Sequence, residues 1–115
     1  MNISYERNGG VLTVFLCGEL DHHAAKKVIP NVLSLIDIEL PTAVVLDFSS
    51  VNFMDSSGIA LIIGTFKRSR SVDGSFKVIN VSRQAYKVLE AASICKIVDV
   101  SCKEAVCASN IRNEG

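Results

Sequence analysis

The feature that most limits the fold of this chain is the alternation of strand-like runs with helix-like apolar stripes. Residues 3–7 and 11–17 are strand-like and flank Asn8-Gly9-Gly10, and an Asn-Gly pair between two such runs is a strong hairpin signal. Beyond Asp21, apolar side chains recur every three or four positions, which is the spacing of one helix face. The chain is therefore predicted to open with two antiparallel strands and a helix.

The first predicted helix carries two further signals. Asp21 is a suitable residue to cap its amino terminus. Pro30 lies inside the apolar stripe, and because proline lacks an N–H and clashes with the preceding turn, it predicts a kink or a shorter helix. The stripe consists of Ala25, Val28, Ile29, Val32, Leu33 and Ile36.

A central strand and a second helix follow the loop at Pro41. Residues 43–48 are rich in β-branched and apolar residues without alternation, as expected of a strand that is covered on both faces. Ser49-Ser50 indicates a turn, and the second helix is expected to end at Lys67-Arg68. Its stripe consists of Ile59, Ile62, Ile63 and Phe66.

The last part of the chain repeats the alternation. A turn at Asp73-Gly74 precedes a predicted strand over 76–80, and a third helical stripe runs from Ala85 to Ala92. Ile97-Val98 suggests a short last strand. Ser101 and Glu104 have the spacing of a capping box, and the helix that they would open carries Ala105, Val106 and Ala108.

These elements predict an α/β fold with a mixed β-sheet. An initial antiparallel hairpin plus parallel strands would form the sheet, with about four helices packed against it. The hydrophobic residues, 49% of the chain, suffice to offset chain entropy by burial. We expect a single domain over residues 1–115 that is a monomer when free.

The charge balance and the short apolar runs argue against several partner classes. Twelve Lys plus Arg residues balance 12 Asp plus Glu, with no long basic run, so a nucleic-acid binder is not expected. The longest apolar run, residues 59–63, is far shorter than the ~20 residues that cross a bilayer. Residues 1–7 lack the basic-then-apolar order of a secretory signal. We therefore expect a cytoplasmic protein without a membrane partner.

The cysteines and histidines do not indicate a metal centre. The cysteines are Cys17, Cys95, Cys102 and Cys107. They lack the paired close spacing of zinc ligands and are predicted to be small buried hydrophobes, with a redox role as the alternative. His22 and His23 would point about 100° apart on a helix, so they are predicted to lie on its surface rather than to share an ion. No cofactor is expected.

The segment that could carry chemistry is Phe53-Met54-Asp55-Ser56-Ser57-Gly58, between a predicted buried strand and an apolar helix. A purely structural role is one interpretation, because Asp, Ser and Gly supply capping oxygens and tight turns. A nucleotide hydrolase is another, because Asp55-x-x-Gly58 resembles the magnesium-side element of GTPases. No glycine-rich loop ending in Gly-Lys-Ser or Gly-Lys-Thr accompanies it, however. A serine hydrolase would need a Gly-x-Ser-x-Gly elbow, which is also missing.

A third interpretation is a phosphorylation switch on a serine at a helix start. Phosphate adds about −1.5 to −2 charges, which a helix amino terminus tolerates. At ~6 Å from a partner carboxylate, with an effective dielectric of about 40 to 80, the repulsion is roughly 1–3 kcal/mol. That weakens a complex by about five- to 150-fold. Such a switch would release a partner and leave the fold intact.

Three segments together resemble a known family. They are Gly18-Glu19-Leu20-Asp21-His22-His23-Ala24-Ala25, Leu46-Asp47-Phe48 and the segment from Phe53 to Gly58. They resemble the bacterial anti-anti-sigma factors built on the STAS domain over essentially the whole chain. The likeness is closest to the stage II sporulation protein AA type, the anti-sigma F factor antagonists, and the first segment is its most diagnostic part.

The resemblance implies a partner switch. The unmodified antagonist would bind an anti-sigma factor that is also a serine kinase, with ADP or ATP bound to the kinase, and so release a sigma factor. The kinase would phosphorylate Ser57, which abolishes binding, and a PP2C-type phosphatase would restore it. The chain would then be a substrate and not an enzyme.

The residues that this resemblance places at the partner are Asp21, Asp55, Ser56, Ser57 and Gly58. For Asp21, simple helix capping is an equal alternative to partner contact, and for Ser56 capping is the favoured role. Two other circuits remain open for a STAS module: a general-stress cascade and an accessory subunit of a lipid transporter.

Overall fold

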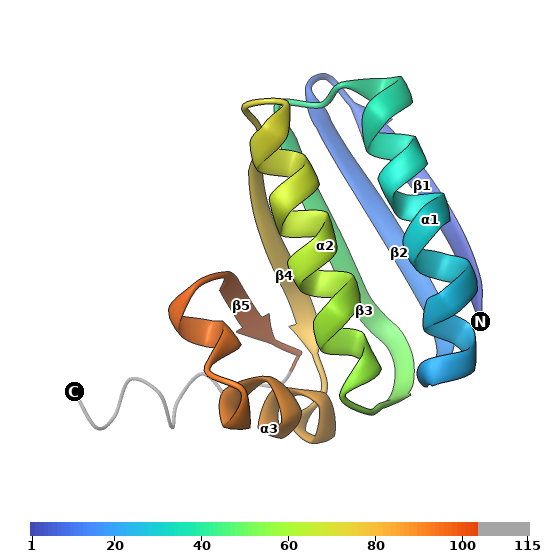
Figure 1. The fold of residues 1–115 in the computed structure, drawn as a ribbon, viewed down its shortest axis with the longest axis vertical. Coiled ribbons are helices and arrows are strands. Elements are labelled where there is room, and N and C mark those ends of the chain that lie inside the picture. Colours follow the sequence, from blue (N-terminus) through green and yellow to red (C-terminus); the bar gives the residue numbers. More distant parts are fainter. Residues whose placement is uncertain (104–115) are drawn as a thin grey trace.

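The computed structural model describes residues 1–103, in which five strands form one sheet in the order β1-β2-β3-β4-β5 (Figure 1). Strands β1 and β2 are antiparallel, and every later neighbour is parallel. The predicted mixed sheet is thus confirmed, with the strand predicted over 43–48 at its centre. The strands are β1 Asn2–Asn8, β2 Val11–Leu20, β3 Ala43–Met54, β4 Ser75–Val81 and β5 Asp99–Cys102.

Three α-helices and one 3₁₀ turn are present within residues 1–103, where about four helices were expected. They are α1 His22–Glu39, α2 Ser57–Ser71, α3 Arg83–Ala91 and the 3₁₀ turn η1 Ile94–Lys96. Ser101, the predicted cap of a fourth helix, lies in β5 instead. Glu104, Ala105, Val106, Cys107 and Ala108 lie outside the described residues.

Helices α1 and α2 lie side by side over one face of the sheet (Figure 1). The hydrophobic core lies between these helices and the sheet. Alternate residues of β2 and β3 point into this core because side chains alternate across a strand. Helix α1 contributes predicted stripe positions. In α2 only Ile62 of the predicted stripe is fully buried, and Leu61, which the stripe omitted, is buried beside it. The fully buried members include Leu12, Val14, Val32, Ile36, Val44, Leu46, Leu61 and Ile62.

The hairpin and the first helix follow the sequence signals except at Pro30. Gly9 has φ +63°, a turn conformation that favours glycine, and β1 and β2 pair directly from Asn8 and Val11. The Asp21 carboxylate accepts a hydrogen bond from the Ala24 N–H at 2.8 Å, which confirms the predicted cap. Helix α1 nevertheless runs past Pro30 to Glu39, so the helix is not shortened there; the alternative, a kink at Pro30, stays a prediction.

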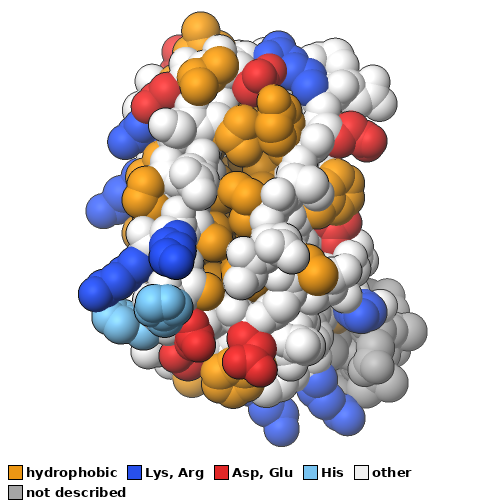
Figure 2. Space-filling view, turned by 90° about the vertical axis from the view of Figure 1, so that its right-hand side faces the viewer, with side chains coloured by type: hydrophobic (Ala, Val, Ile, Leu, Met, Phe, Trp, Pro, Cys, Tyr) orange, Lys and Arg blue, Asp and Glu red, His pale blue; other side chains and the backbone are white. Residues whose placement is uncertain are grey.

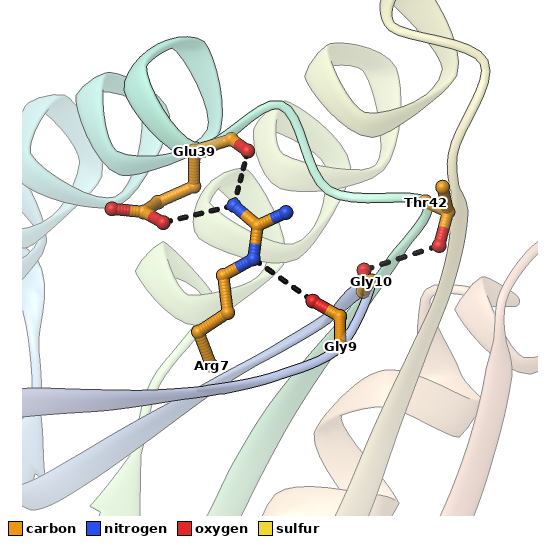
Figure 3. Close-up of polar contacts among 5 residues, drawn as sticks. All are labelled: Arg7, Gly9, Gly10, Glu39 and Thr42. Carbon is orange, nitrogen blue, oxygen red and sulfur yellow. Dashed lines mark hydrogen bonds and ion pairs between the residues drawn. The ribbon is translucent and has the colours of Figure 1, made fainter.

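Polar contacts fix the end of the molecule that carries the hairpin turn (Figure 3). Arg7 donates from Nε to the Gly9 carbonyl at 3.0 Å and from Nη1 to the Glu39 carboxylate at 2.9 Å. The Thr42 hydroxyl donates to the Gly10 carbonyl at 3.1 Å. These bonds tie the turn to the end of α1 and the start of β3.

Two strand boundaries differ from the prediction. Ser49-Ser50 lies inside β3, which continues to Met54 because β2 still pairs with it there. The last strand is Asp99–Cys102 and not Ile97-Val98, because the N–H groups of Ile97 and Val98 both donate back to the Ile94 carbonyl at 2.9 Å. None of the helices within residues 1–103 is long and apolar enough to cross a membrane.

Candidate functional site

Two strand-to-helix junctions lie side by side at the end of the sheet opposite the hairpin turn. Because β2 and β3 are parallel, with Leu20 aligned to Met54, both strands lead into their helices at this same end. The Asp55 N–H donates to the Leu20 carbonyl at 3.3 Å, which joins the two junctions directly. The structure thus brings the Asp21 junction beside Asp55-Ser56-Ser57, although more than thirty sequence positions separate them.

The turn into α2 is shaped by Asp55 and not by Ser56. The Asp55 Oδ1 accepts a hydrogen bond from the Ser57 N–H at 2.8 Å, and the Asp55 carbonyl accepts from the Gly58 N–H at 3.1 Å. Ser56 occupies the cap position with helical backbone angles, and its side chain makes no capping bond. The capping role predicted for the Ser56 side chain is therefore wrong. The N–H groups that it would cap, those of Gly58 and Ile59, donate to the backbone carbonyls of Asp55 and Ser56 instead.

Ser57 is the first residue of α2, and its side chain is half-buried. Its N–H is held by Asp55, while its hydroxyl has no hydrogen-bond partner among residues 1–103. A partly exposed hydroxyl on a fixed backbone is open to modification without the loss of a native hydrogen bond. The geometry is thus compatible with the predicted phosphoacceptor.

Gly58 is buried beneath this turn and allows α2 to start close to the sheet. A Cβ at Gly58 would overlap the Met54 side chain and lie 3.2 Å from a Leu20 methyl group. The glycine therefore lets the ends of β2 and β3 and the start of α2 pack together. This packing role limits how much of Gly58 a partner could touch.

Asp21 keeps both of its possible roles, since its carboxylate caps α1 and is half-buried. It lines a surface hollow of 510 Å³ together with Met1, Glu19, His23 and Lys27. Figure 2 shows the face of the molecule with α1 and β1, on which the pale-blue histidines lie beside red acidic side chains towards the lower end, while other acidic side chains lie nearer the top. His22 and His23 are exposed, which confirms that they lie on the helix surface.

Phe53 opens the segment that the sequence singled out, but it was not among the residues expected at the partner; it is 42% exposed near the end of β3. Phe53 adds exposed apolar area one residue before Met54 and two residues before Asp55 in the chain. Exposed aromatic residues are enriched at protein interfaces. Only its adjacency to Asp55 could have pointed to it, because apolar residues in a strand are usually buried.

Asp47, from the Leu46-Asp47-Phe48 segment, has a structural role. Its Oδ1 accepts hydrogen bonds from the Ser49 N–H at 2.8 Å and from the Asn80 amide at 3.2 Å. Burial acts to raise the pKa of Asp47. The hydrogen bonds from Ser49 and Asn80 and the charge of Lys103 outweigh burial, so the pKa lies below its usual value. The carboxylate is thus held ionised inside the sheet.

The cysteines differ from the prediction that they are buried hydrophobes. Cys17 is exposed because it lies on the face of β2 away from the helices, and Cys95 and Cys102 are half-buried. Burial and a hydrogen bond with Cys95 raise the pKa of Tyr86 to about 12. Among residues 1–103, no three His, Cys, Asp or Glu side chains are grouped as metal ligands.

A family model that describes the STAS domain matches residues 2–107. The chain belongs to the STAS domain family. The resemblance drawn from three short segments is thereby confirmed, and the match spans both junctions of the candidate site.

Two curated relatives of this STAS chain carry antagonist names. The anti-sigma F factor antagonist of Paenibacillus polymyxa is 32% identical over 87% of this chain and 86% of its own length. The anti-sigma-B factor antagonist of Bacillus subtilis (strain 168) is 26% identical over 90% of this chain and 93% of its own length.

Solved structures share the STAS fold over nearly the whole chain. The unphosphorylated form of the anti-sigma factor antagonist SpoIIAA is 25% identical, with a TM-score of 0.75 and coverage of 97% of both chains. The phosphorylated form of the Bacillus SpoIIAA has a TM-score of 0.67 at 25% identity, covering 96% of this chain and 100% of that chain.

Proposed function

We propose that this STAS chain is an anti-sigma factor antagonist whose docking surface is switched by phosphorylation of Ser57. The surface comprises the Asp21 junction and the turn from Asp55 to Gly58. The observation that carries the proposal is the half-buried Ser57 hydroxyl, which has no hydrogen bond within residues 1–103, on a turn fixed by Asp55. The existence of SpoIIAA in phosphorylated and unphosphorylated forms supports such a switch.

The electrostatics of the turn support release of a partner without loss of the fold. A phosphate at the first residue of α2 would meet the positive end of the helix, which stabilises an anion. The Asp55 carboxylate beside it adds a like charge and reduces that gain. The partner, by contrast, would face about two new negative charges where it had met a neutral hydroxyl.

The circuit that we propose is the one implied by the resemblance to the anti-sigma F factor antagonists. The partner would be an anti-sigma factor serine kinase with ADP or ATP bound, and a PP2C-type phosphatase would remove the phosphate. The chain would act in the cytoplasm as a monomer when free and be the substrate of both enzymes. Control of sigma F in sporulation is supported by the Paenibacillus polymyxa relative.

The test is a pull-down with the anti-sigma factor kinase of the source cell, with ADP or ATP, followed by intact-mass analysis. Wild-type protein should bind with ADP, gain one phosphoryl group with ATP and dissociate. Ser57→Ala should stay bound with ATP. Ser57→Asp adds one negative charge, so it should bind about three- to tenfold more weakly.

Ser75→Ala is the matched control, because Ser75 is exposed at the start of β4, at the end of the sheet away from Ser57. It should switch like the wild type. Equal binding of Ser57→Ala and Ser57→Asp, or a phosphoryl group that still appears in Ser57→Ala, would contradict the proposal.

A general-stress circuit is the second candidate, because the Bacillus subtilis relative is an anti-sigma-B factor antagonist. Both circuits predict the same behaviour of Ser57 and differ in the partner. Purification of the chain from the source cell with ADP, and identification of the bound kinase, distinguishes the two.

A further inference from the structure

The end of β3 lacks a neighbouring strand on one side. Strand β3 pairs with β4 only from Ala43 to Asp47, whereas its pairing with β2 continues to Met54. In a parallel sheet the N–H and C=O of one residue point to the same neighbour. The backbone groups that face away from β2 over the last part of β3 therefore need other hydrogen-bond partners.

Side chains from three other positions supply those bonds. The Ser49 N–H donates to the Asp47 carboxylate, and the Ser49 carbonyl accepts from Lys103 Nζ at 2.8 Å. At Met54 a single side chain satisfies both groups. The Gln84 Oε1 accepts from the Met54 N–H at 3.0 Å, and the Gln84 Nε2 donates to the Met54 carbonyl at 2.8 Å.

Gln84 is held in place for this contact by the start of α3. The Ser82 hydroxyl accepts a hydrogen bond from the Ala85 N–H at 3.1 Å, and Ala85 is 1% exposed. An amide side chain carries a donor and an acceptor on neighbouring atoms, so it can donate to the carbonyl and accept from the N–H of one residue at once. Gln84 thus replaces a missing strand at one residue, across 30 sequence positions.

We infer that Gln84 is a positioning residue for the Ser57 hydroxyl. Met54 is followed by Asp55, whose carboxylate holds the Ser57 N–H, so the bonds to Gln84 fix the residue from which the turn begins. This inference rests on the proposed function, in which Ser57 must align with a kinase. Loss of the Gln84 amide leaves the Ser57 hydroxyl chemically unchanged but allows the turn that carries it to move.

The test compares Gln84→Met, which keeps the side-chain length without either hydrogen bond, and Gln84→Glu, which keeps only the acceptor. Lys87→Ala is the matched surface control on α3, because Lys87 is exposed. Val32→Ala, a fully buried position in α1, is the control for lost stability alone. The readouts are amide exchange at Met54 and Ser57, and kcat and KM for phosphorylation, both well below the unfolding temperature.

Both Gln84 variants should speed amide exchange at Ser57 by at least about tenfold and lower kcat at saturating substrate by a similar factor. Gln84→Met should also speed exchange at Met54. Lys87→Ala and Val32→Ala should keep the wild-type kcat. Unchanged exchange at Ser57 in Gln84→Met would overturn the inference, as would faster exchange with an unchanged kcat.

A wild-type protein that the kinase leaves unmodified would instead contradict the proposed function. The amide exchange rates, which need no kinase, would then still show whether Gln84 holds the turn. Exchange at Ser57 as slow as in the wild type in both Gln84 variants would show that Gln84 does not position Ser57.

Discussion

At the scale of single residues, the buried carboxylate of Asp47 makes the stability of the fold depend on pH. It is 9% exposed and receives hydrogen bonds from Ser49 and Asn80. Its ionised form fits this environment better than its protonated form, which is why its folded-state pKa lies below the usual value. A lowered pKa means that the ionised carboxylate contributes stability above the unfolded-state pKa and loses it as the pH falls.

We predict that Asp47→Asn lowers the free energy of unfolding at pH 7 by about 1–3 kcal/mol, because hydrogen bonds to a charged group are replaced. The difference from wild type should shrink as the pH falls below the ordinary carboxyl pKa of 3.8. Urea unfolding of both proteins at several pH values measures this difference in the free energy of unfolding. Asp99→Asn, at an exposed position, is the control, and a difference that does not depend on pH would refute the linkage.

The residue scale also shows where sequence analysis reached its limit at the site. A cap before α2 could be expected from Asp55, Ser56 and Ser57, but several side chains there could accept the bond. The choice of Asp55 depends on backbone angles, which the composition of the turn does not determine. The contact of Gln84 with Met54 joins residues 30 positions apart, and no local pattern reveals it.

At the scale of elements, packing outweighs local signals in α1. A proline inside a helix costs about 3 kcal/mol. Ending α1 before Pro30 would expose Val32 and Ile36, both 0% exposed, and each buried side chain contributes about 1.5–3 kcal/mol. The burial of the two side chains therefore equals or exceeds the cost of the proline, and the helix continues. The apolar stripe predicted the extent of the helix correctly, whereas the shorter helix suggested by Pro30 is wrong and the kink suggested as its alternative stays a prediction.

Two glycines of α2 test how tightly this helix docks on the sheet. A Cβ at Gly58 would overlap the buried Met54 side chain, whereas a Cβ at Gly64 would meet nothing within 4 Å. We predict that Gly58→Ala lowers stability by about 1–2 kcal/mol, because overpacking exceeds the gain in helix propensity.

Gly64→Ala should raise stability by up to about 1 kcal/mol, since an alanine inside a helix is favoured over glycine. Thermal and urea unfolding measure both variants. A Gly58→Ala protein as stable as Gly64→Ala would mean that the start of α2 can move away from Met54, contrary to the packing described.

At the scale of the whole molecule, the parallel pairing of β2 and β3 makes the site possible. The sequence predicted the mixed sheet and a helix after each of these two strands. Two parallel strands that each lead into a helix do so at the same end of the sheet. The end of the chain was predicted less well. A last strand of four residues carries little periodicity, and Ser101 has a cap-like spacing to Glu104 although it lies in β5.

The same architecture predicts that phosphorylation acts on docking and not on folding. The Ser57 hydroxyl has no hydrogen bond within residues 1–103 to lose, and the helix dipole and the Asp55 carboxylate act on a phosphate in opposite directions. Fully phosphorylated protein should therefore differ from unmodified protein by less than about 1 kcal/mol in the free energy of unfolding. Urea unfolding of both forms measures this, with the dissociation constant for the kinase measured on the same samples.

A loss of more than about 2 kcal/mol would show that the phosphate disrupts the start of α2, because the helix dipole contributes no more than that in favourable geometry. Release of the partner would then follow from local unfolding rather than from charge repulsion across an intact surface.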